Sequence, residues 1–232
     1  MVTLYIMIYD FNIITGGCIK MRLKQHLDIG NKVLEDNIIS TFKVNRVAYL
    51  FGTIAPDLNC IYPAHRLRTT ESRFSRKLKI AGNASTSLIK SFMLGVITHY
   101  VCDYFCYAHN IESLGLPHKK YEDNLYKYYE SHLDEMEDAY DNLLDHWLDF
   151  KVQSKKKCVK NNCLTSESHV EFIMNQVKNM NKLYMNSDKV DKKVGWTDKI
   201  EQMQKDIEYA TFMVERVLTI TLEPFKCLVG EY

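Results

Sequence analysis

Hydrophobic residues recur at intervals of three or four along most of the chain, which is the pattern of amphipathic helices that bury one face. Residues 58–84 are the exception, and there we expect mostly loop, with one basic helical stretch around 73–78. The chain is therefore predicted to be all-α, a single compact multi-helix domain of six or seven helices. The other predicted helices run over about 26–42, through Val47 to Phe51, and over about 88–107, 118–150, 166–185 and 197–222.

The segment 88–107 differs from the others because it is apolar on nearly every face. Between Phe92 and Ala108 it carries one histidine, His99, and one carboxylate, Asp103. These 17 residues are short for a membrane span of roughly 20, and both polar groups fall near the middle, so we expect a buried central helix. A histidine and an aspartate buried four residues apart must be paired, hydrogen-bonded or bound to metal.

Prolines and polar caps suggest where the helices begin and end. Pro56 disfavours helical geometry at the residue before it, so the segment 52–57 is expected to break the second helix. Ser85 can cap the central helix. Pro117 stands at the start of the helix that begins near His118, where a proline is tolerated.

The composition adds no general attraction for polyanions. The 232 residues include 30 Lys and Arg against 29 Asp and Glu, a formal charge of +1. We therefore expect no stable nucleic-acid complex. The length and the polar residues of the segment 92–108 lead us to expect no transmembrane span, and we expect the protein to be a monomer. The chain also lacks a glycine-rich phosphate loop, which excludes the phosphate-loop nucleotide hydrolases. It lacks a Gly-x-Ser-x-Gly nucleophile elbow as well, which excludes the α/β-hydrolases that carry this motif.

The N-terminal residues indicate where the domain begins, and the cysteines indicate the cellular compartment. Val2 to Tyr9 is apolar but lacks the basic region of a signal peptide, and Met21 opens a more ordinary start. We expect residues 1–20 to be an extension outside the fold and residues 21–232 to form the domain.

The seven cysteines are an odd number and indicate a reducing compartment, so a cytoplasmic protein is expected, with secretion as the alternative.

Two histidines stand four residues before a carboxylate, a spacing that places both groups on one face of a helix. The pairs are His99 with Asp103 and His118 with Glu122, and His109 lies between them. On an unbroken helix His109 would be rotated about 240° from Asp103, so it must lie past the helix end to join the others. Such a mixed set of histidines and carboxylates suits zinc with an open coordination position.

These residues, with others upstream, resemble zinc-dependent phospholipase C of the clostridial and bacillus type, in a superfamily shared with fungal single-strand nucleases. The resemblance covers about residues 22–130. It is carried by the order and spacing of the following residues: His26 in a first helix, Pro56-Asp57 after a glycine, His65, His99-x-x-x-Asp103-x-x-x-x-x-His109, and His118-x-x-x-Glu122.

The resemblance implies a helical enzyme that uses up to three zinc ions. One zinc would be held by Asp57, His65, His99 and Asp103. A second would be held by His109, His118 and Glu122. Asp103 would bridge to a third, held by His26.

In the family an N-terminal tryptophan completes the third site, but the tryptophans of this chain are Trp147 and Trp196. We therefore expect two zinc ions, with a weakly bound third as the alternative because its site is incomplete. The implied reaction is the attack of a metal-activated water on a phosphodiester, with Asp57 as general base. The substrate would be a phospholipid headgroup or a nucleotide.

Other interpretations remain open. The chain could be a non-catalytic helical protein with a structural or vestigial zinc site, or a relative of the nucleotidase or nuclease type. The His-Asp phosphohydrolases are excluded because no histidine is followed directly by aspartate. His132 is not expected to join the site, since it lies about 21 Å along the helix from His118.

Overall fold

The computed structural model describes residues 20–35, 44–58, 67–111, 116–132, 166–186 and 196–222. Within these ranges it contains eight α-helices, two short 3₁₀ helices and no strand, so the all-α prediction is confirmed. The helices are α2 (Lys20–Glu35), α4 (Arg46–Ile54), α5 (Leu67–Asn83), α6 (Ser87–Tyr104), α7 (Tyr107–Asn110), α8 (Leu116–Ser131), α10 (Ser166–Asn186) and α11 (Ile200–Leu222). The 3₁₀ helices are η1 (Ala55–Leu58) and η3 (Trp196–Asp198).

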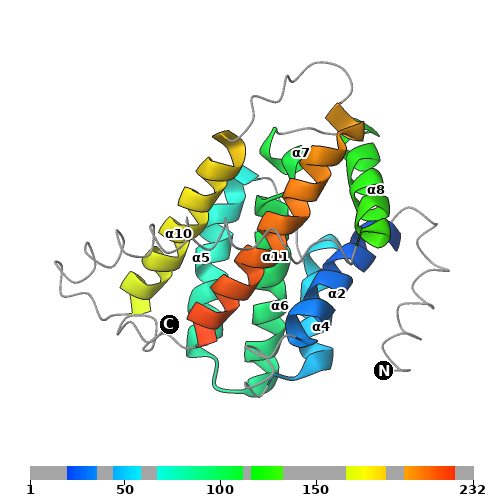
Figure 1. The fold of residues 1–232 in the computed structure, drawn as a ribbon. Coiled ribbons are helices and arrows are strands. Elements are labelled where there is room, and N and C mark those ends of the chain that lie inside the picture. Colours follow the sequence, from blue (N-terminus) through cyan, green and yellow to red (C-terminus); the bar gives the residue numbers. More distant parts are fainter. Residues whose placement is uncertain are drawn as a thin grey trace.

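Helix α6 is the centre of the fold. It packs against α4, α5 and α11, and every residue from Leu94 to Tyr104 is buried. Figure 1 shows α11 lying across α6, with α5 and α10 to one side and α2 and α4 to the other. A helix that is apolar on all faces has to be surrounded in this way. Among the described helices, none is long and apolar enough to cross a bilayer.

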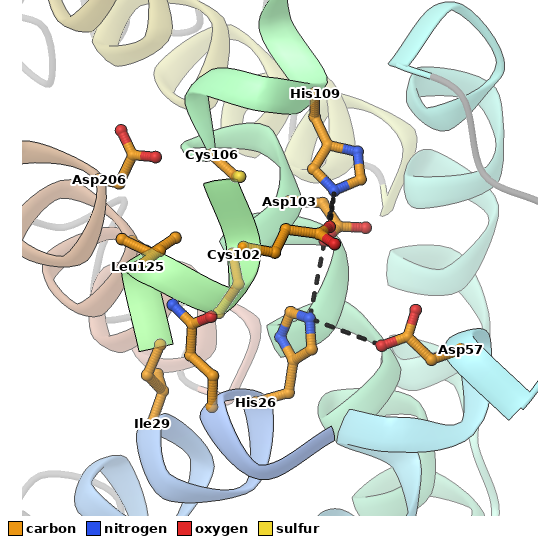
Figure 2. Close-up of a pocket in the computed structure, with 12 residues that line it drawn as sticks. His26, Ile29, Asp57, Cys102, Asp103, Cys106, His109, Leu125 and Asp206 are labelled. Carbon is orange, nitrogen blue, oxygen red and sulfur yellow. Dashed lines mark ion pairs between the residues drawn. The ribbon is translucent and has the colours of Figure 1, made fainter. Parts of the chain in front are cut away.

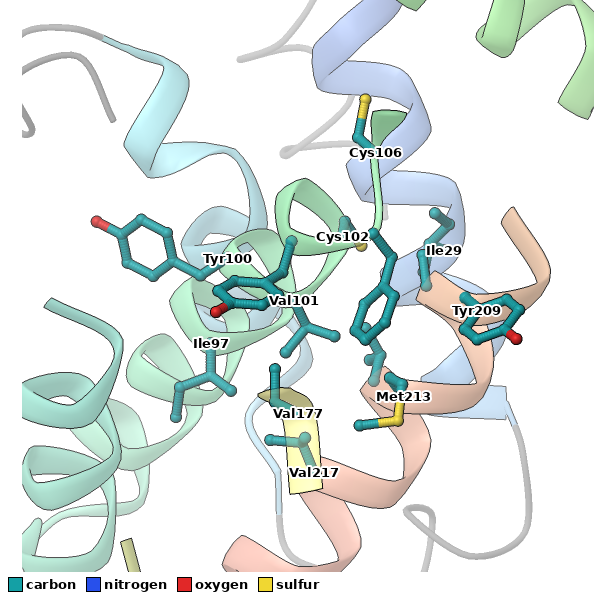
Figure 3. Packing of buried hydrophobic residues seen from close by; sticks show 14 of the residues in the cluster. Ile29, Ile97, Tyr100, Val101, Cys102, Cys106, Val177, Tyr209, Met213 and Val217 are labelled. Atoms are coloured by element: carbon teal, nitrogen blue, oxygen red, sulfur yellow. The ribbon is translucent and has the colours of Figure 1, made fainter. Parts of the chain in front are cut away.

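The core beside α6 is formed largely by aromatic and branched side chains. Val101 lies with Val177 of α10 and with Met213 and Val217 of α11, as Figure 3 shows. Just beyond the end of α6, the ring of Phe105 stacks on that of Tyr209 at 5.9 Å between centroids. Packing of this kind holds α6, and with it His99 and Asp103, at a fixed position in the bundle.

Helices α4 and α6 cross with their backbones in contact. A Cβ atom on Gly95 would lie 2.0 Å from the carbonyl oxygen of Tyr49, and one on Gly52 would lie 2.2 Å from that of Phe92. Only two glycines facing each other permit this approach. The crossing also brings the last turn of α4 against the middle of α6, where the predicted metal ligands begin.

Helix α4 does end within the predicted break at 52–57, at Ile54, but the predicted cause was wrong. Helix α4 continues through Gly52 to Ile54, and Ala55 remains helical at φ −56° and ψ −37° although Pro56 follows it. The preference of the residue before a proline is a bias that packing can overcome. Ala55 is completely buried, and its N–H donates to the carbonyl of Phe51.

Residues 67–83 were predicted to be mostly loop, and this too was wrong, because they form the single helix α5. Its apolar stripe is narrow: Phe74, Leu78 and Ala81 are 1%, 2% and 0% exposed, and polar residues surround them. The spacing i, i+4, i+7 was present in the sequence, but the many charged neighbours concealed it. Residues 59–66 lie outside the described part of the chain.

Three further boundaries differ from expectation. The cap of α6 is Thr86 rather than Ser85, with its hydroxyl accepting from the N–H of Ile89. The central helix ends at Tyr104, and after Phe105 and Cys106 a separate turn, α7, begins, which raises the number of described helices to eight. Helix α8 ends at Ser131, well before the predicted limit near 150; residues 133–150, like residues 1–19, lie outside the described ranges.

Candidate metal centre

Seven of the eight predicted ligands lie in the described part of the chain, and all seven converge on one region. They come from α2, η1, the last turns of α6, α7 and the first turns of α8, as Figure 2 shows for four of them. His65, the eighth, falls in the segment 59–66 outside the described residues. The residues brought together are His26, Asp57, His99, Asp103, His109, His118 and Glu122.

The first group consists of His26, Asp57 and His99, whose ligand atoms all lie within 4.8 Å of one another. The Nε2 atom of each histidine is 3.8 Å from an oxygen of Asp57. These separations are longer than hydrogen bonds. Two ligand atoms on a tetrahedral zinc, each about 2.0–2.2 Å from the ion, are about 3.4 Å apart. The spacing of the group is therefore close to what a shared cation requires.

The second group consists of His109, His118 and Glu122. The Oε1 atom of Glu122 is 2.8 Å from Nε2 of His118 and 3.3 Å from Nε2 of His109. The rings of the two histidines meet edge to face at 4.7 Å between centroids. The required bend after α6 is present, since His109 lies on α7 and faces back toward the end of α6.

Asp103 lies between the two groups and contacts both. Its Oδ2 is 3.2 Å from Nε2 of His99, and its Oδ1 is 3.7 Å from Nε2 of His26 and 3.5 Å from Nε2 of His109. In Figure 2 the dashed lines run from His109 through Asp103 to His26 and on to Asp57. A single carboxylate thus connects both groups, which is the placement expected of a ligand shared by two ions.

The orientation of His99 is set by the helix crossing described above. Its Nδ1 is 2.8 Å from the carbonyl oxygen of Thr53, in the last turn of α4. Because a carbonyl can only accept, Nδ1 carries the proton and Nε2 is left to face Asp57 and Asp103. A backbone carbonyl that fixes the tautomer and the ring plane is a usual partner of a metal-binding histidine.

The electrostatics of the centre favour bound positive charge. Burial disfavours the charged form of His99, but the carboxylates of Asp103 and Asp57 outweigh it and raise its pKa to about 9. Burial is likewise outweighed at His109, whose pKa is raised by Asp103 and Glu122. Hydrogen bonds from His109 and His118 lower the pKa of Glu122 to about 2, against the effect of burial. Protons on the histidines balance the carboxylates here, and a divalent cation could replace them.

Three other side chains that could bind metal, those of His132, Cys102 and Cys106, belong to neither group. His132 stacks on Tyr128 at 4.1 Å between ring centroids, and its Nδ1 lies 3.0 Å from the carbonyl oxygen of that residue, so it is placed away from the centre as expected. Cys102 and Cys106 are buried free thiols. They line a pocket that is also lined by His26, Asp57, Asp103, His109 and Glu122. Burial raises the pKa of both, which keeps them as neutral thiols and poor zinc ligands.

The sequence reading missed one buried carboxylate, Asp206 of α11, which lines the pocket on the α11 side (Figure 2). It is 2% exposed. A signal was present, because Asp206 shares a helix face with the buried Ala210 and Met213 at the spacing i, i+4, i+7. A carboxylate on an apolar face needs partners, as the buried histidine and aspartate of α6 do.

The family model described as zinc-dependent phospholipase C matches residues 25–208. The matched region includes every predicted ligand and extends into α11, well beyond the residues 22–130 on which the resemblance was recognised. Comparisons with curated proteins and with solved structures found no match.

Proposed function

Since this chain belongs to the zinc-dependent phospholipase C family, we propose that it is a zinc-dependent hydrolase of phosphodiesters. The observation that carries the proposal is the pair of three-residue groups joined by Asp103 at one pocket. Two ions sharing a carboxylate can hold both the attacking and the leaving oxygen of an in-line displacement at phosphorus. A single structural zinc site would not need two groups at one pocket.

The donor set supports zinc in both positions. The proposed ligands of one ion are His26, Asp57 and His99, with Asp103 shared. Those of the other ion are His109, His118 and Glu122, again with Asp103 shared. Histidine nitrogens and carboxylate oxygens are ordinary zinc ligands, and a zinc ion with four ligands can take a fifth during the reaction.

His65 remains a proposed ligand of the first ion. The resemblance implies that His26 and Asp103 hold a third ion, and Nε2 of His26 is 3.7 Å from Oδ1 of Asp103. We propose instead that His26 binds the first ion, since its ligand atom lies within 4.8 Å of those of Asp57 and His99. Two ions are enough to engage all seven described ligands, so we propose two zinc ions per chain.

Zinc bound at this centre would lower the pKa of a coordinated water toward 7 and offset the charge on the phosphate. Asp57 is the residue best placed to accept a proton from the attacking water. Its side chain is 18% exposed, compared with 6% for Asp103 and 11% for Glu122. The two more buried carboxylates would then serve as ligands, while Asp57 faces incoming substrate and solvent.

The proposed substrate is a phosphodiester, either a phospholipid headgroup or a nucleotide. The test uses zinc-loaded protein with nitrophenyl-phosphocholine, phosphatidylcholine vesicles and a dinucleotide as substrates. We expect hydrolysis of at least one, loss of activity with chelator, and recovery with zinc. Protein that holds two zinc ions and leaves all three substrates intact would show instead that the metals are structural.

The role of Asp57 is tested by Asp57→Asn, which preserves shape but removes the base. If Asp57 accepts the proton, the variant retains most of its zinc and loses roughly 100-fold or more in rate, the usual scale of general-base catalysis. Zinc content and rate falling together would make Asp57 chiefly a ligand. Asp28→Asn is a suitable control, since Asp28 lies on α2 and its charge interacts with those of Lys24 and Glu130, neither of which is a proposed ligand.

A further inference from the structure

The second metal group depends on a helix too short to hold its own position. His109 lies on α7, which has four residues, whereas His118 and Glu122 lie on α8. One isolated helical turn is not stable by itself, because the first turn fixes several residues for a single hydrogen bond. Contacts from elsewhere in the fold must therefore hold α7 at the correct distance from α8.

Asp206 of α11 makes such contacts to both helices. Its Oδ2 accepts from the backbone N–H of Tyr107 at 2.8 Å and from the hydroxyl of Tyr121, also at 2.8 Å. Tyr107 is the first residue of α7, two before His109, and Tyr121 directly precedes Glu122. One carboxylate oxygen thus joins the two helices at points next to their proposed ligands.

The other oxygen fixes the carboxylate itself. Oδ1 of Asp206 accepts from the hydroxyl of Tyr184 on α10 and, at 2.8 Å, from the side-chain amide of Gln202 one turn earlier on α11. All four partners are donors, and an ionised carboxylate is the one side chain that can accept from four donors without offering a proton. Burial raises the pKa of Asp206 to about 6, which leaves it ionised at pH 7.

We propose that Asp206 is a positioning residue for the second metal group, holding His109 on α7 against His118 and Glu122 on α8. In this role Asp206 is not a ligand and acts through Tyr107 and Tyr121. The inference rests on the proposed function only in taking these three residues as ligands. It assigns no chemical step to Asp206.

The fold offers a matched pair of variants that separates positioning from general stability. Tyr121→Phe and Tyr184→Phe each remove one hydroxyl from a tyrosine that is 1% exposed or less, and each hydroxyl donates to Asp206. Tyr121 is the link to α8 through Oδ2, whereas Tyr184 is the link to α10 through Oδ1. Each change takes away one hydroxyl donor from the same carboxylate. A larger effect of Tyr121→Phe therefore reports the position of α8.

The experiment titrates zinc into the metal-free full-length protein in competition with a chromophoric chelator, which resolves the two binding steps. His118→Ala first identifies the step that belongs to the second group. We expect Tyr121→Phe and Asp206→Asn to weaken that step about 10- to 100-fold, the usual effect of losing an outer partner of a ligand. We expect the other step to change less than about threefold. We expect Tyr184→Phe to weaken the second-group step much less than Tyr121→Phe does, because Gln202 still donates to Oδ1 of Asp206.

Equal weakening by Tyr121→Phe and Tyr184→Phe, or equal weakening of both steps by Tyr121→Phe, would overturn the proposal even if Asp206→Asn fails to fold. Wild-type protein that binds two zinc ions and hydrolyses nothing would refute the proposed function and leave this inference intact. Wild-type protein that binds no zinc would refute both.

Discussion

Gly95 is the position where a single methyl group should disturb both the fold and the metal centre. In Gly95→Ala the new Cβ would lie 2.0 Å from the carbonyl oxygen of Tyr49 and 2.9 Å from Cα of Gly52. Carbon and oxygen normally approach to about 3.3 Å at closest. The obstructing atoms belong to the backbone, so no side-chain rotation can relieve the contact. Helices α4 and α6 must therefore separate by about 1 Å.

The cost follows from two opposing effects. Forcing extra volume into a packed core costs about 1–3 kcal/mol, and a clash with backbone belongs at the upper end of that range. Alanine is favoured over glycine within a helix by about 0.5–1 kcal/mol, which offsets part of the cost. We expect a net loss of about 2 kcal/mol in the free energy of unfolding. For a chain of this size that lowers Tm by about 4–8 °C.

The same separation should weaken zinc binding at the first group. The hydrogen bond from Nδ1 of His99 to the carbonyl of Thr53 is 2.8 Å long and spans the α4–α6 crossing. Moving the helices apart by about 1 Å takes it beyond hydrogen-bonding range. His99 would then lose the contact that orients its ring, and the affinity of that zinc should fall about 10- to 100-fold.

The assays are urea unfolding of the metal-free protein and zinc competition with a chelator. Gly82→Ala is the matched control, because Gly82 lies in α5 and a Cβ there would meet no atom within 4 Å. We expect that control to bind zinc normally and to be stabilised by up to about 1 kcal/mol. If Gly95→Ala were as stable as Gly82→Ala and kept its zinc affinity, the argument from the helix crossing would be refuted.

Two further predictions concern the metal centre. Elemental analysis should show that His118→Ala loses about one zinc per chain whereas His132→Ala retains both, and equal losses would contradict the placement of His132 outside both groups. In the metal-free protein, burial and the stronger opposing effect of Asp103 and Asp57 raise the pKa of His99 from 6.5 to about 9. The protonated form of His99 therefore stabilises the folded state fully below pH 6.5, and this stabilisation is lost as the pH rises through 9. Thermal scans should show Tm falling over this interval with chelator but not with zinc, and a flat profile with chelator would contradict the assignment.

The sequence alone was sufficient where local pattern and chemistry coincide. The apolar surface of α6 required a buried helix, and His99 and Asp103 within it required each other or a cation. The spacing of His118 and Glu122 placed both on one helix face, and the position of His109 required a helix end before it. These conclusions depend on the geometry of a helix, which is the same wherever a helix occurs.

Tertiary structure decided what depends on neighbours distant in the sequence. Pro56 and the charged residues of 67–83 favoured loops by local rules, but packing against α6 kept both segments helical. The contact of Gly52 with Gly95 and the hydrogen bond from His99 to Thr53 exist only because two helices cross at one point. The grouping of His26 with Asp57 and the four donors around Asp206 likewise join residues from separate helices. Spacing along the chain specifies which faces residues share, but distances between helices are set by side-chain packing across the whole core.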